Sequence, residues 1–393
     1  MNDCFVYVSQ IPRNGTSGQN KFENGFIRNL LKTRVGKRNL DIKVFSTTLE
    51  GENSDDDRLV LIPLTNKNYS GYVLHQIRLL FSLWTFLWSQ RKNNVYMFIR
   101  YHDAMIAPLI LSFLFDIRLT MRTGPVLPNL ADCDKKPGTV IYHCIKWVLW
   151  LFLLKASSIT TVTETIKKWI VDTYNLRPEK IVVIPNAADT TLFFPEAADR
   201  KKWNLPENEF VFGYVGAVYE EQGLSTIIQA LGLLKKDEVK VPIFFIVGDG
   251  NYVDPLKFMS KELGVSDRII WAGNIPHEEV RSAINACDMM LAPFQKKDLN
   301  VKGSSALKLW EYLACDKPVL ASEFKDHQFL EKQNLGKMVE PDNIKLWAET
   351  LAQEAKAKNS TLQGRGEKFI AKEHSYDFVV EKFISISLGQ KMI

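Results

Sequence analysis

The stretch Gly303-Ser-Ser-Ala-Leu-Lys-Leu-Trp-Glu311-Tyr-Leu-Ala-Cys-Asp-Lys-Pro-Val-Leu-Ala321 carries the most informative pattern in this chain. Small residues at 303–306 open a helical pattern, and a proline and a short β-rich run follow it. Free backbone N–H groups at the start of such a helix bind anions, above all phosphate. Glu311, further along the helix, can reach a part of the ligand beyond the phosphates, such as ribose hydroxyls. Because the chain has no Gly-Lys-Ser/Thr of the P-loop type, the pattern favours a sugar-nucleotide site.

Outside this stretch, short β-rich runs alternate with helical patterns almost throughout the chain. Such alternation predicts an α/β fold with two parallel sheets that carry helices on both faces. The predicted strands are 5–8, 42–45, 95–99, 118–121, 158–162, 181–184, 210–215, 243–247, 269–271, 289–292, 318–321 and 337–339. The predicted helices lie near 20–33, 71–90, 104–115, 138–155, 164–174, 222–236, 253–263, 277–286, 304–315 and 343–357.

The length of 393 residues is too great for one ordinary core and natural for two domains. The stretch 185–195 is bounded by prolines and has no period, so we place the break there. We predict a Rossmann-like domain over 1–190, a second over 191–373, and a C-terminal helix in 374–393 that packs back toward the first domain. Ligands bind at the carboxyl ends of such strands, so two domains facing each other would hold a ligand in the cleft between them.

The first half of the chain is the basic half. Residues 1–190 contain 24 Lys and Arg against 16 Asp and Glu, whereas the remainder contains 26 against 29. Two aromatic-rich helical stretches in this half, 79–88 and 147–154, are flanked by Lys or Arg, as helices that dock on a bilayer surface often are. A helix that is apolar all round can equally belong to a core. Neither stretch reaches the ~20 residues that a membrane span needs.

Five cysteines are scattered through the chain, at positions 4, 133, 144, 287 and 315, without a Cys-x-x-Cys pair. We interpret them as reduced, buried thiols of a cytosolic protein, and we predict that His143 and Cys144 lie in a core. The N-terminus lacks the charged region and apolar run of a secretory signal. The expected location is the cytoplasm, either free or peripheral on the cytoplasmic face of a membrane.

Two polar side chains, His102 and Arg122, follow predicted strands of the first half and are expected at their carboxyl ends. His102 can position an acceptor or a transferred group, or it can be a hydrogen-bonded structural histidine. Arg122 can contact a leaving phosphate or an anionic acceptor, or it can form an ion pair, for example with Asp103. With Glu311, these two residues are the candidate catalytic groups.

Four blocks in order resemble the GT-B-fold retaining glycosyltransferases of family 4, also known as glycosyl transferases group 1, and the resemblance spans roughly 5–385. The blocks are Ile184-Pro-Asn-Ala-Ala-Asp189 with Phe194-Pro195, Phe212-Gly-Tyr-Val-Gly216 with Gly223, Ile246-Val-Gly-Asp-Gly250 with Trp271-Ala-Gly-Asn-Ile-Pro-His-Glu-Glu-Val280, and the stretch 303–321. The resemblance implies two Rossmann-like domains facing across a cleft, with an acceptor bound by the first and a nucleotide-diphosphate sugar, UDP- or GDP-linked, bound by the second.

The resemblance also implies roles for individual positions. Glu311 would bind the ribose hydroxyls, and backbone amides at 304–307 would hold the diphosphate. The segment 273–275 would line the base, and a loop at 14–18 would cover the donor. The implied donor-binding residues are Gly15, Ser17, Gly18, Gly216, Gly248, Asn274, Ile275, Gly303, Ser304, Ser305, Ala306, Leu307, Lys308 and Glu311.

The chain departs from the family pattern at several charged positions. Where the family has an Arg and a Lys in the first donor-domain loop, this chain has Ala217 and Gln222. At the position of the family's first acid in the donor motif, this chain has Gly303. At the position of the family's histidine after a first-domain strand, it has Arg122. Lys308, or nearby Lys302, can supply the missing cation, and an anion at the helix start would offset the unfavourable helix dipole on Lys308. Alternatively, Lys308 forms a solvated pair with Glu311.

The resemblance implies transfer with retention of anomeric configuration, to a hydroxyl of a glycan or lipid-linked acceptor in polysaccharide, glycolipid or glycan assembly. It also implies that no metal or other cofactor is needed, and no nucleic-acid partner is expected. Two alternatives remain open from the residues. One is a catalytically inactive GT-B scaffold, which the missing charges suggest, and the other is a sugar-nucleotide-modifying GT-B enzyme such as an epimerase.

Overall fold

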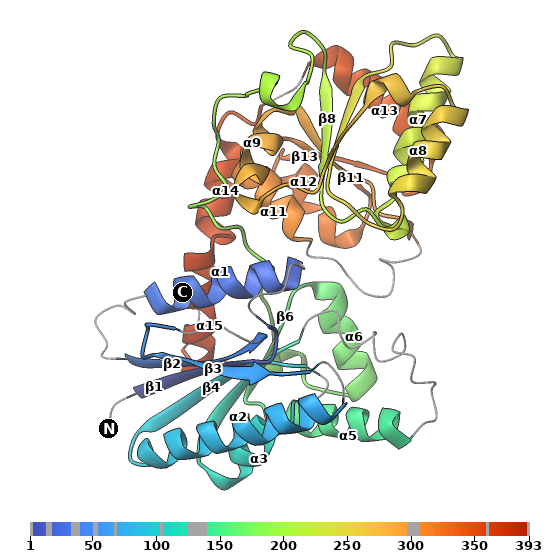
Figure 1. Cartoon of the computed structure of the whole chain (residues 1–393). Coiled ribbons are helices and arrows are strands. Elements are labelled where there is room, and N and C mark those ends of the chain that lie inside the picture. The colour runs from blue at the N-terminus through green and yellow to red at the C-terminus, as the bar shows by residue number, and fades with distance from the viewer. Residues whose placement is uncertain are drawn as a thin grey trace. The chain divides into compact units, whose positions relative to one another are not determined.

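The computed structural model describes residues 3–12, 18–32, 40–49, 54–66, 69–102, 105–123, 140–296, 306–358 and 361–390. The chain forms two compact units (Figure 1). Unit 1 contains Met1–Asn186 and Tyr376–Ile393, and unit 2 contains Ala187–Ser375. Each unit is an open α/β sheet with helices on both faces, so the predicted architecture of two parallel-sheet, Rossmann-like domains is confirmed.

Unit 1 has a seven-stranded parallel sheet with the strand order β3-β2-β1-β4-β5-β6-β7. The strands are β1 (Asp3–Ser9), β2 (Leu40–Leu49), β3 (Leu59–Leu64), β4 (Asn94–Arg100), β5 (Ile117–Arg122), β6 (Ser158–Thr161) and β7 (Ile181–Val183). The sequence prediction missed β3, which contains Pro63. Proline cannot donate to a strand ladder, and β3 tolerates it because it is the edge strand and pairs with β2 alone.

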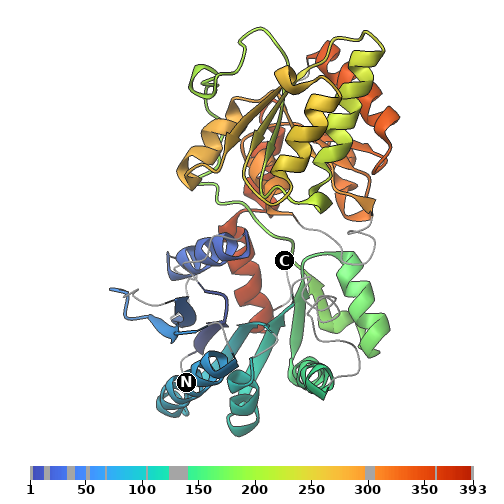
Figure 2. The same cartoon turned by 45° about the vertical axis from the view of Figure 1, so that its right-hand side comes forward.

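The helices of unit 1 cover both faces of this sheet. They are α1 (Gly18–Lys32), α2 (Tyr69–Ser89), α3 (Ala107–Leu114), α5 (Val140–Lys155), α6 (Glu164–Tyr174) and α15 (Tyr376–Ser387). Figures 1 and 2 show α1 and α15 on one face and α2, α3 and α5 on the other. Strand β1 has buried side chains on both faces, as a central parallel strand should.

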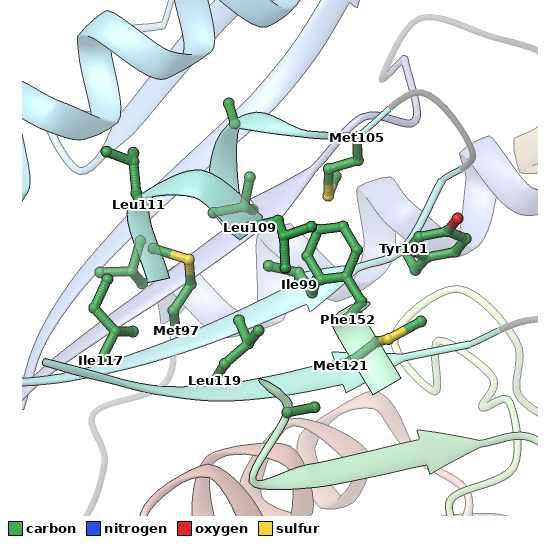
Figure 3. Close-up of a cluster of buried hydrophobic side chains, with 14 of the residues drawn as sticks. Met97, Ile99, Tyr101, Met105, Leu109, Leu111, Ile117, Leu119, Met121 and Phe152 are labelled. Atoms are coloured by element: carbon green, nitrogen blue, oxygen red, sulfur yellow. The ribbon is translucent and has the colours of Figure 1, made fainter. Parts of the chain in front are cut away.

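The core under α3 and α5 is made mainly of aliphatic and methionine side chains, together with Phe152 and Tyr101 (Figure 3). Leu109 and Leu111 of α3 and Phe152 of α5 lie against Met97 of β4 and Leu119 of β5. The opposite face is aromatic, and the ring of Phe98 lies 4.7 Å from that of Phe383 in α15. Helix α15 is therefore an integral layer of unit 1, although it is the last element of the chain.

Unit 2 has a six-stranded parallel sheet with the order β10-β9-β8-β11-β12-β13. The strands are β8 (Val211–Val215), β9 (Ile243–Val247), β10 (Ile269–Gly273), β11 (Met289–Ala292), β12 (Val319–Ser322) and β13 (Gly336–Val339). The helices are α7 (Leu224–Lys236), α8 (Val253–Glu262), α9 (Val280–Asn285), α11 (Leu307–Ala314), α12 (Phe329–Lys332), α13 (Ile344–Ala357) and α14 (Arg365–Glu373). Two separate apolar clusters fill the two faces, one under α7, α8 and α13 and the other under α9, α11, α12 and α14.

The prediction that the cysteines are buried is confirmed for three of them and wrong for Cys144. Cys4, Cys287 and Cys315 are buried as predicted, and burial raises the pKa of the Cys4 thiol to about 12. His143 and Cys144 are exposed on α5, so the prediction that they lie in a core is wrong. The reason is helical periodicity, because the inward positions of α5 fall at Leu149, Phe152 and Leu153 instead. Cys133 lies outside the described residues.

The packing of α15 on α1 predicts an unusual effect of a Gly→Ala change. Alanine for glycine inside a helix normally stabilises by ~0.5–1 kcal/mol. A Cβ at Gly25 would lie 2.6 Å from Cζ of Tyr376. We therefore expect Gly25→Ala to lower the free energy of unfolding by ~1–3 kcal/mol, measured by urea denaturation.

The control for this prediction is the same change in a Tyr376→Leu background, which lacks the ring atoms that would clash. There, Gly25→Ala should cost little or should stabilise the protein. An equal loss in both backgrounds would contradict the packing of α15 against α1.

Candidate functional site

Both sheets reverse their strand order next to their first strand, between β1 and β4 in unit 1 and between β8 and β11 in unit 2. The connections on the two sides of such a point leave toward opposite faces, which opens a crevice at the carboxyl ends of the strands. In unit 2, Gly216 directly follows β8, and α11 with Lys308 and Glu311 is the helix after β11. The topology thus brings these three predicted residues to the switch point of unit 2.

Lys308 is the charged centre of this region. Its ammonium donates hydrogen bonds to the Tyr214 hydroxyl at 2.8 Å and to Oε1 of Gln222 at 2.7 Å. It also lies 4.1 Å from the centre of the Tyr214 ring. Lys308 is therefore directed toward β8 and the loop that follows it. The alternative of a solvated surface pair between Lys308 and Glu311 is wrong.

The surroundings of Lys308 disfavour its charged form. Burial lowers its pKa from 10.5 to about 7, against the opposing effect of the Glu311 carboxylate. The residue also lies in the first turn of α11, where the helix dipole disfavours a cation. A bound anion would relieve both penalties. The arrangement is that of a cation that is available for an anionic ligand rather than one neutralised by a carboxylate contact.

Two tyrosines hold the strand end and α11 together. The Tyr214 hydroxyl donates to the carbonyl of Ala217 at 2.7 Å, which fixes the loop after β8. The Tyr312 hydroxyl accepts from the Val215 N–H at 2.9 Å and donates to the Val215 carbonyl at 3.0 Å. Neither tyrosine was predicted as a site residue from the sequence. A weak sequence pattern could have indicated them. Tyr214 is at a position of its strand whose side chain faces one side of the sheet, and Tyr312 is one helical turn after Lys308, on the same side of the helix.

Glycines at the strand ends make this packing possible. A Cβ on Gly216 would lie 3.0 Å from Nζ of Lys308, and a Cβ on Gly248 would lie 1.9 Å from the carbonyl oxygen of Gly216. Both glycines have positive φ, at 152° and 131°. Gly248 therefore lets the ends of β8 and β9 meet, and Gly216 lets the Lys308 ammonium reach the backbone.

The remaining predicted residues of unit 2 lie around the same edge of the sheet or outside the described part of the chain. Ala306 is the N-cap of α11 and Leu307 its first residue, and no side chain caps the free N–H groups there. Glu311 is half-buried one turn after Lys308. Asn274 and Ile275 follow β10, with Asn274 exposed. Gly303, Ser304 and Ser305 lie outside the described residues.

In unit 1, the loop predicted to cover the donor is mostly outside the described residues, which include neither Gly15 nor Ser17. Gly18 is the first residue of α1. His102 follows β4 at the switch point of unit 1, and its ring is stacked on that of Tyr72 with centres 6.4 Å apart. Burial, followed by the charge of Arg100, lowers the pKa of His102, so the imidazole is neutral at pH 7. A neutral ring at this strand end suits hydrogen bonding to a neutral hydroxyl.

Arg122 has a structural environment that the sequence did not reveal. The guanidinium lies between the rings of Phe22 and Phe383, 5.0 and 4.7 Å from their centres, and Nη2 donates to Oδ1 of Asn186 at 2.8 Å. Only 3% of the residue is exposed, so it does not present a cation to a ligand. Burial lowers its pKa to about 9. We therefore correct the predicted contact with a phosphate, and we assign Arg122 to positioning Asn186 and α15 within unit 1.

A buried ion pair beside Arg122 was also missed. Glu23 of α1 accepts from Arg100 at the end of β4 and from the Tyr7 hydroxyl at 2.9 Å. The Glu23 side chain is fully buried, so this pairing fixes the register of α1 against β1 and β4. Nothing in the spacing of these residues along the sequence connects them.

Within the described residues, no three His, Cys, Asp or Glu side chains gather as a metal site requires. A hollow of about 320 Å³ lies beside the loop after β8 and is lined by Tyr219, Glu220, Glu221, Asn251 and Tyr252. Its two glutamates would repel phosphate, so we do not count it as part of the anion site.

Comparison with known proteins gives the family context of unit 2. Residues 195–362 match the family model described as Glycosyl transferases group 1. The chain is 29% identical over 209 residues to 2-deoxystreptamine glucosyltransferase of Streptomyces kanamyceticus, covering 47% of this chain and 52% of that protein. It is 23% identical over 254 residues to the probable glycosyltransferase WbjE of Pseudomonas aeruginosa, covering 63% and 62%. The chain thus spans about half the length of the curated relatives it matches.

Solved structures resemble the whole chain. Sucrose-phosphate synthase from Thermosynechococcus elongatus superposes with a TM-score of 0.75 at 15% identity over 99% of both chains. HepE of Anabaena in complex with UDP gives a TM-score of 0.69 at 15% identity, covering 99% of this chain and 100% of that one. At such low identity these similarities establish the fold alone. The chain thus has a GT-B fold, and its second unit matches the family model described as Glycosyl transferases group 1, which supports a transferase.

Proposed function

We propose that this protein is a retaining glycosyltransferase of family 4 that moves a sugar from a UDP- or GDP-sugar to a hydroxyl of a glycan or lipid-linked acceptor. Its role would be in polysaccharide, glycolipid or glycan assembly at the cytoplasmic face of a membrane. The observation that carries the proposal is the Lys308 ammonium beside Gly216 at the switch point of unit 2. This is where a group 1 domain would need a positive charge for a diphosphate.

The donor would be held by unit 2 through three kinds of contact. The N–H groups at the start of α11 and the Lys308 ammonium would bind the diphosphate. Glu311 would accept hydrogen bonds from the ribose hydroxyls, and Asn274 and Ile275 would lie against the base. HepE, which shares the fold, has been solved with UDP and with UDP-glucose, which supports a nucleotide-sugar donor.

Lys308 also accounts for one of the charges that the family pattern has and this chain lacks. Gln222 stands where the resemblance expects a Lys, and its Oε1 lies 2.7 Å from the Lys308 ammonium. A cation therefore lies next to the end of the Gln222 side chain, as the family pattern requires, but it comes from Lys308 of α11 and not from residue 222 itself. This relocation argues against the part of the inactive-scaffold alternative that rested on Gln222; the alternative also rested on Ala217 and Gly303.

The proposed reaction breaks the bond between the anomeric carbon and the donor phosphate and forms a bond to the acceptor oxygen on the same face. The proton of the acceptor hydroxyl would pass to the departing phosphate oxygen, so no protein base is required. The helix N–H groups and Lys308 would stabilise the charge that develops on the diphosphate. His102 would position the acceptor hydroxyl from unit 1. No metal ion has a role in this scheme, as the resemblance implies.

The first test is donor binding followed by turnover. A donor at ~100 times its dissociation constant should add ~2.7 kcal/mol to the free energy of unfolding, visible as a thermal shift with one UDP- or GDP-sugar. The shift should persist in EDTA and be lost in Glu311→Ala. A shift with sugar transfer to an added acceptor supports the proposal. Binding without transfer, but with a changed donor sugar, would indicate the epimerase alternative, and no binding to any donor would indicate the scaffold.

A second test moves the cation back to the loop. Lys308→Met keeps the length of the side chain and removes its charge, so donor affinity should fall by about tenfold to a hundredfold. Adding Gln222→Lys should recover much of this loss, because the two side chains end at the same place. Isothermal titration with the donor measures both effects.

The matched control is Lys345→Met, which removes an exposed cation from α13 and should leave donor affinity unchanged. Unchanged affinity in Lys308→Met would show that the ammonium does not meet the diphosphate.

The lowered pKa of Lys308 predicts how binding depends on pH. With a pKa of about 7 in the free protein, the amine is mostly neutral above pH 7, and a bound diphosphate raises that pKa. Donor binding at ~pH 8 should therefore take up close to one proton, and affinity should fall by up to about tenfold per pH unit above 7. Titration calorimetry in buffers of different ionisation enthalpy measures this uptake. Its persistence in Lys308→Met would assign the proton to another group.

A further inference from the structure

Unit 1 has a large apolar surface on the outer side of α2, α3 and α5. Thirteen of the nineteen large apolar side chains that are exposed in the described part of the chain belong to these helices or the residue before α3. They are Val73, Leu74, Ile77, Phe81, Trp84, Trp88, Ile106, Ile110, Phe113, Leu114, Trp147, Trp150 and Leu154. We call this set the aromatic face. Soluble proteins rarely expose so continuous an apolar surface without a partner.

The three helices place these residues side by side. Both views show α2, α3 and α5 together on the same side of the unit 1 sheet (Figures 1 and 2). The ring of Trp84 in α2 lies 5.3 Å from that of Phe115, which follows α3. Lys155 of α5 lies over the ring of Phe113 in α3, 5.3 Å from its centre. The aromatic face is therefore continuous across the three helices.

The apolar core of unit 1 does not account for these residues, because each helix has a separate inner stripe for it. In α2 the core positions are Leu79, Leu83 and Leu87. In α3 and α5 they include Leu109 and Phe152, which point into the cluster of Figure 3. The outward residues are a second apolar stripe that folding of the described chain leaves in solvent. Because its inner stripe is in the core, α2 lies along the sheet, and no described helix is long and apolar enough to cross a membrane.

Charge indicates what covers the aromatic face. Residues 69–92, 105–116 and 140–155 contain five cations, Arg78, Arg91, Lys92, Lys146 and Lys155, and a single acid, Asp116. Arg91 lies 5.4 Å from the centre of the Trp88 ring, so its cation borders the apolar surface as a headgroup-facing side chain would. Four of the nine tryptophans of the chain are on this face, and tryptophan favours the bilayer interface.

We propose that the aromatic face is a docking surface for a bilayer that contains anionic lipids. The apolar side chains enter the headgroup region and the cations meet lipid phosphates. A second copy of this chain is a poorer occupant, because a two-fold contact would bring the same cationic border against itself. The role of this surface rests on the proposed function, since a lipid-linked acceptor would then lie in the membrane on which unit 1 docks.

The experiment is flotation of the full chain with vesicles of phosphatidylcholine, with or without about one third phosphatidylglycerol. The test variant carries Phe81→Asp, Phe113→Asp and Trp147→Asp, one highly exposed residue from each helix, at 71%, 60% and 61% exposure. The control is Phe258→Asp, an aromatic residue with 66% exposure on α8 of unit 2. We expect the wild type and the control to bind anionic vesicles equally. The triple variant should bind them at least about tenfold more weakly.

A milder variant tests the cations without touching apolar residues. Arg91→Gln with Lys92→Gln should lower binding to anionic vesicles by roughly fivefold per cation and leave binding to neutral vesicles unchanged. Brominated lipids should quench tryptophan fluorescence in the wild type and not in the triple variant. Equal flotation of wild type and triple variant overturns the proposal, as does wild type that fails to bind at low salt. Self-association that the triple variant abolishes, without vesicle binding, would identify the face as an interface between copies.

Donor binding is measured on the same variants without vesicles, which separates the two proposals. Vesicle binding by a protein that takes no nucleotide sugar would leave the docking surface standing and reject the proposed function. Donor binding by a triple variant that no longer floats supports both.

Discussion

The ammonium group of Lys308, held between Tyr214 and Gln222 at the end of β8, is the interaction on which the candidate site depends. It needs glycine at 216, because any larger residue would press on it. It also needs α11 anchored to the strand, which Tyr312 does through both polar groups of Val215. Burial and the dipole of α11 both raise the free energy of the charged form of Lys308. A bound anion next to the ammonium would offset this free energy.

In unit 1, buried charged side chains hold helices on the sheet and do not face a ligand. Arg122 and the pair of Glu23 with Arg100 lie beneath α1 and α15, among aromatic rings. Removing either partner of such a pair would leave an uncompensated charge, so these groups specify one arrangement of the layers. Arg122 bonds Asn186, the last residue of unit 1 before unit 2, and contacts Phe383 after the chain returns. One guanidinium thus links the last residue before the chain leaves unit 1 to the helix with which it returns.

The sequence was sufficient for the fold because its signal is local and repeated. Alternation of β-rich runs with helical patterns identified twelve of the thirteen strands in the part of the chain that the structure describes. The strand that was missed is β3, an edge strand that contains proline. The glycines at 216 and 248 were also recognisable, through the resemblance of the motifs around them to those of the glycosyltransferase family. By contrast, periodicity could not say which side of α5 faces the core when nearly every residue is apolar. His143 and Cys144 were misplaced for that reason.

The sequence by itself determined the two-sheet architecture and the residue types that follow the strands, because hydrophobic period and loop position depend on neighbours in the chain. The strand order, and with it the switch point, came from the tertiary structure. Only the tertiary structure decided which charges are neutralised and which are available. Lys308 is separated from Tyr214 by 94 positions and Arg122 from Asn186 by 64. Whether a cation faces a ligand or an aromatic stack depends on such distant contacts. The same is true of the aromatic face, which exists only because the fold sets three helices side by side and leaves their outer stripes uncovered.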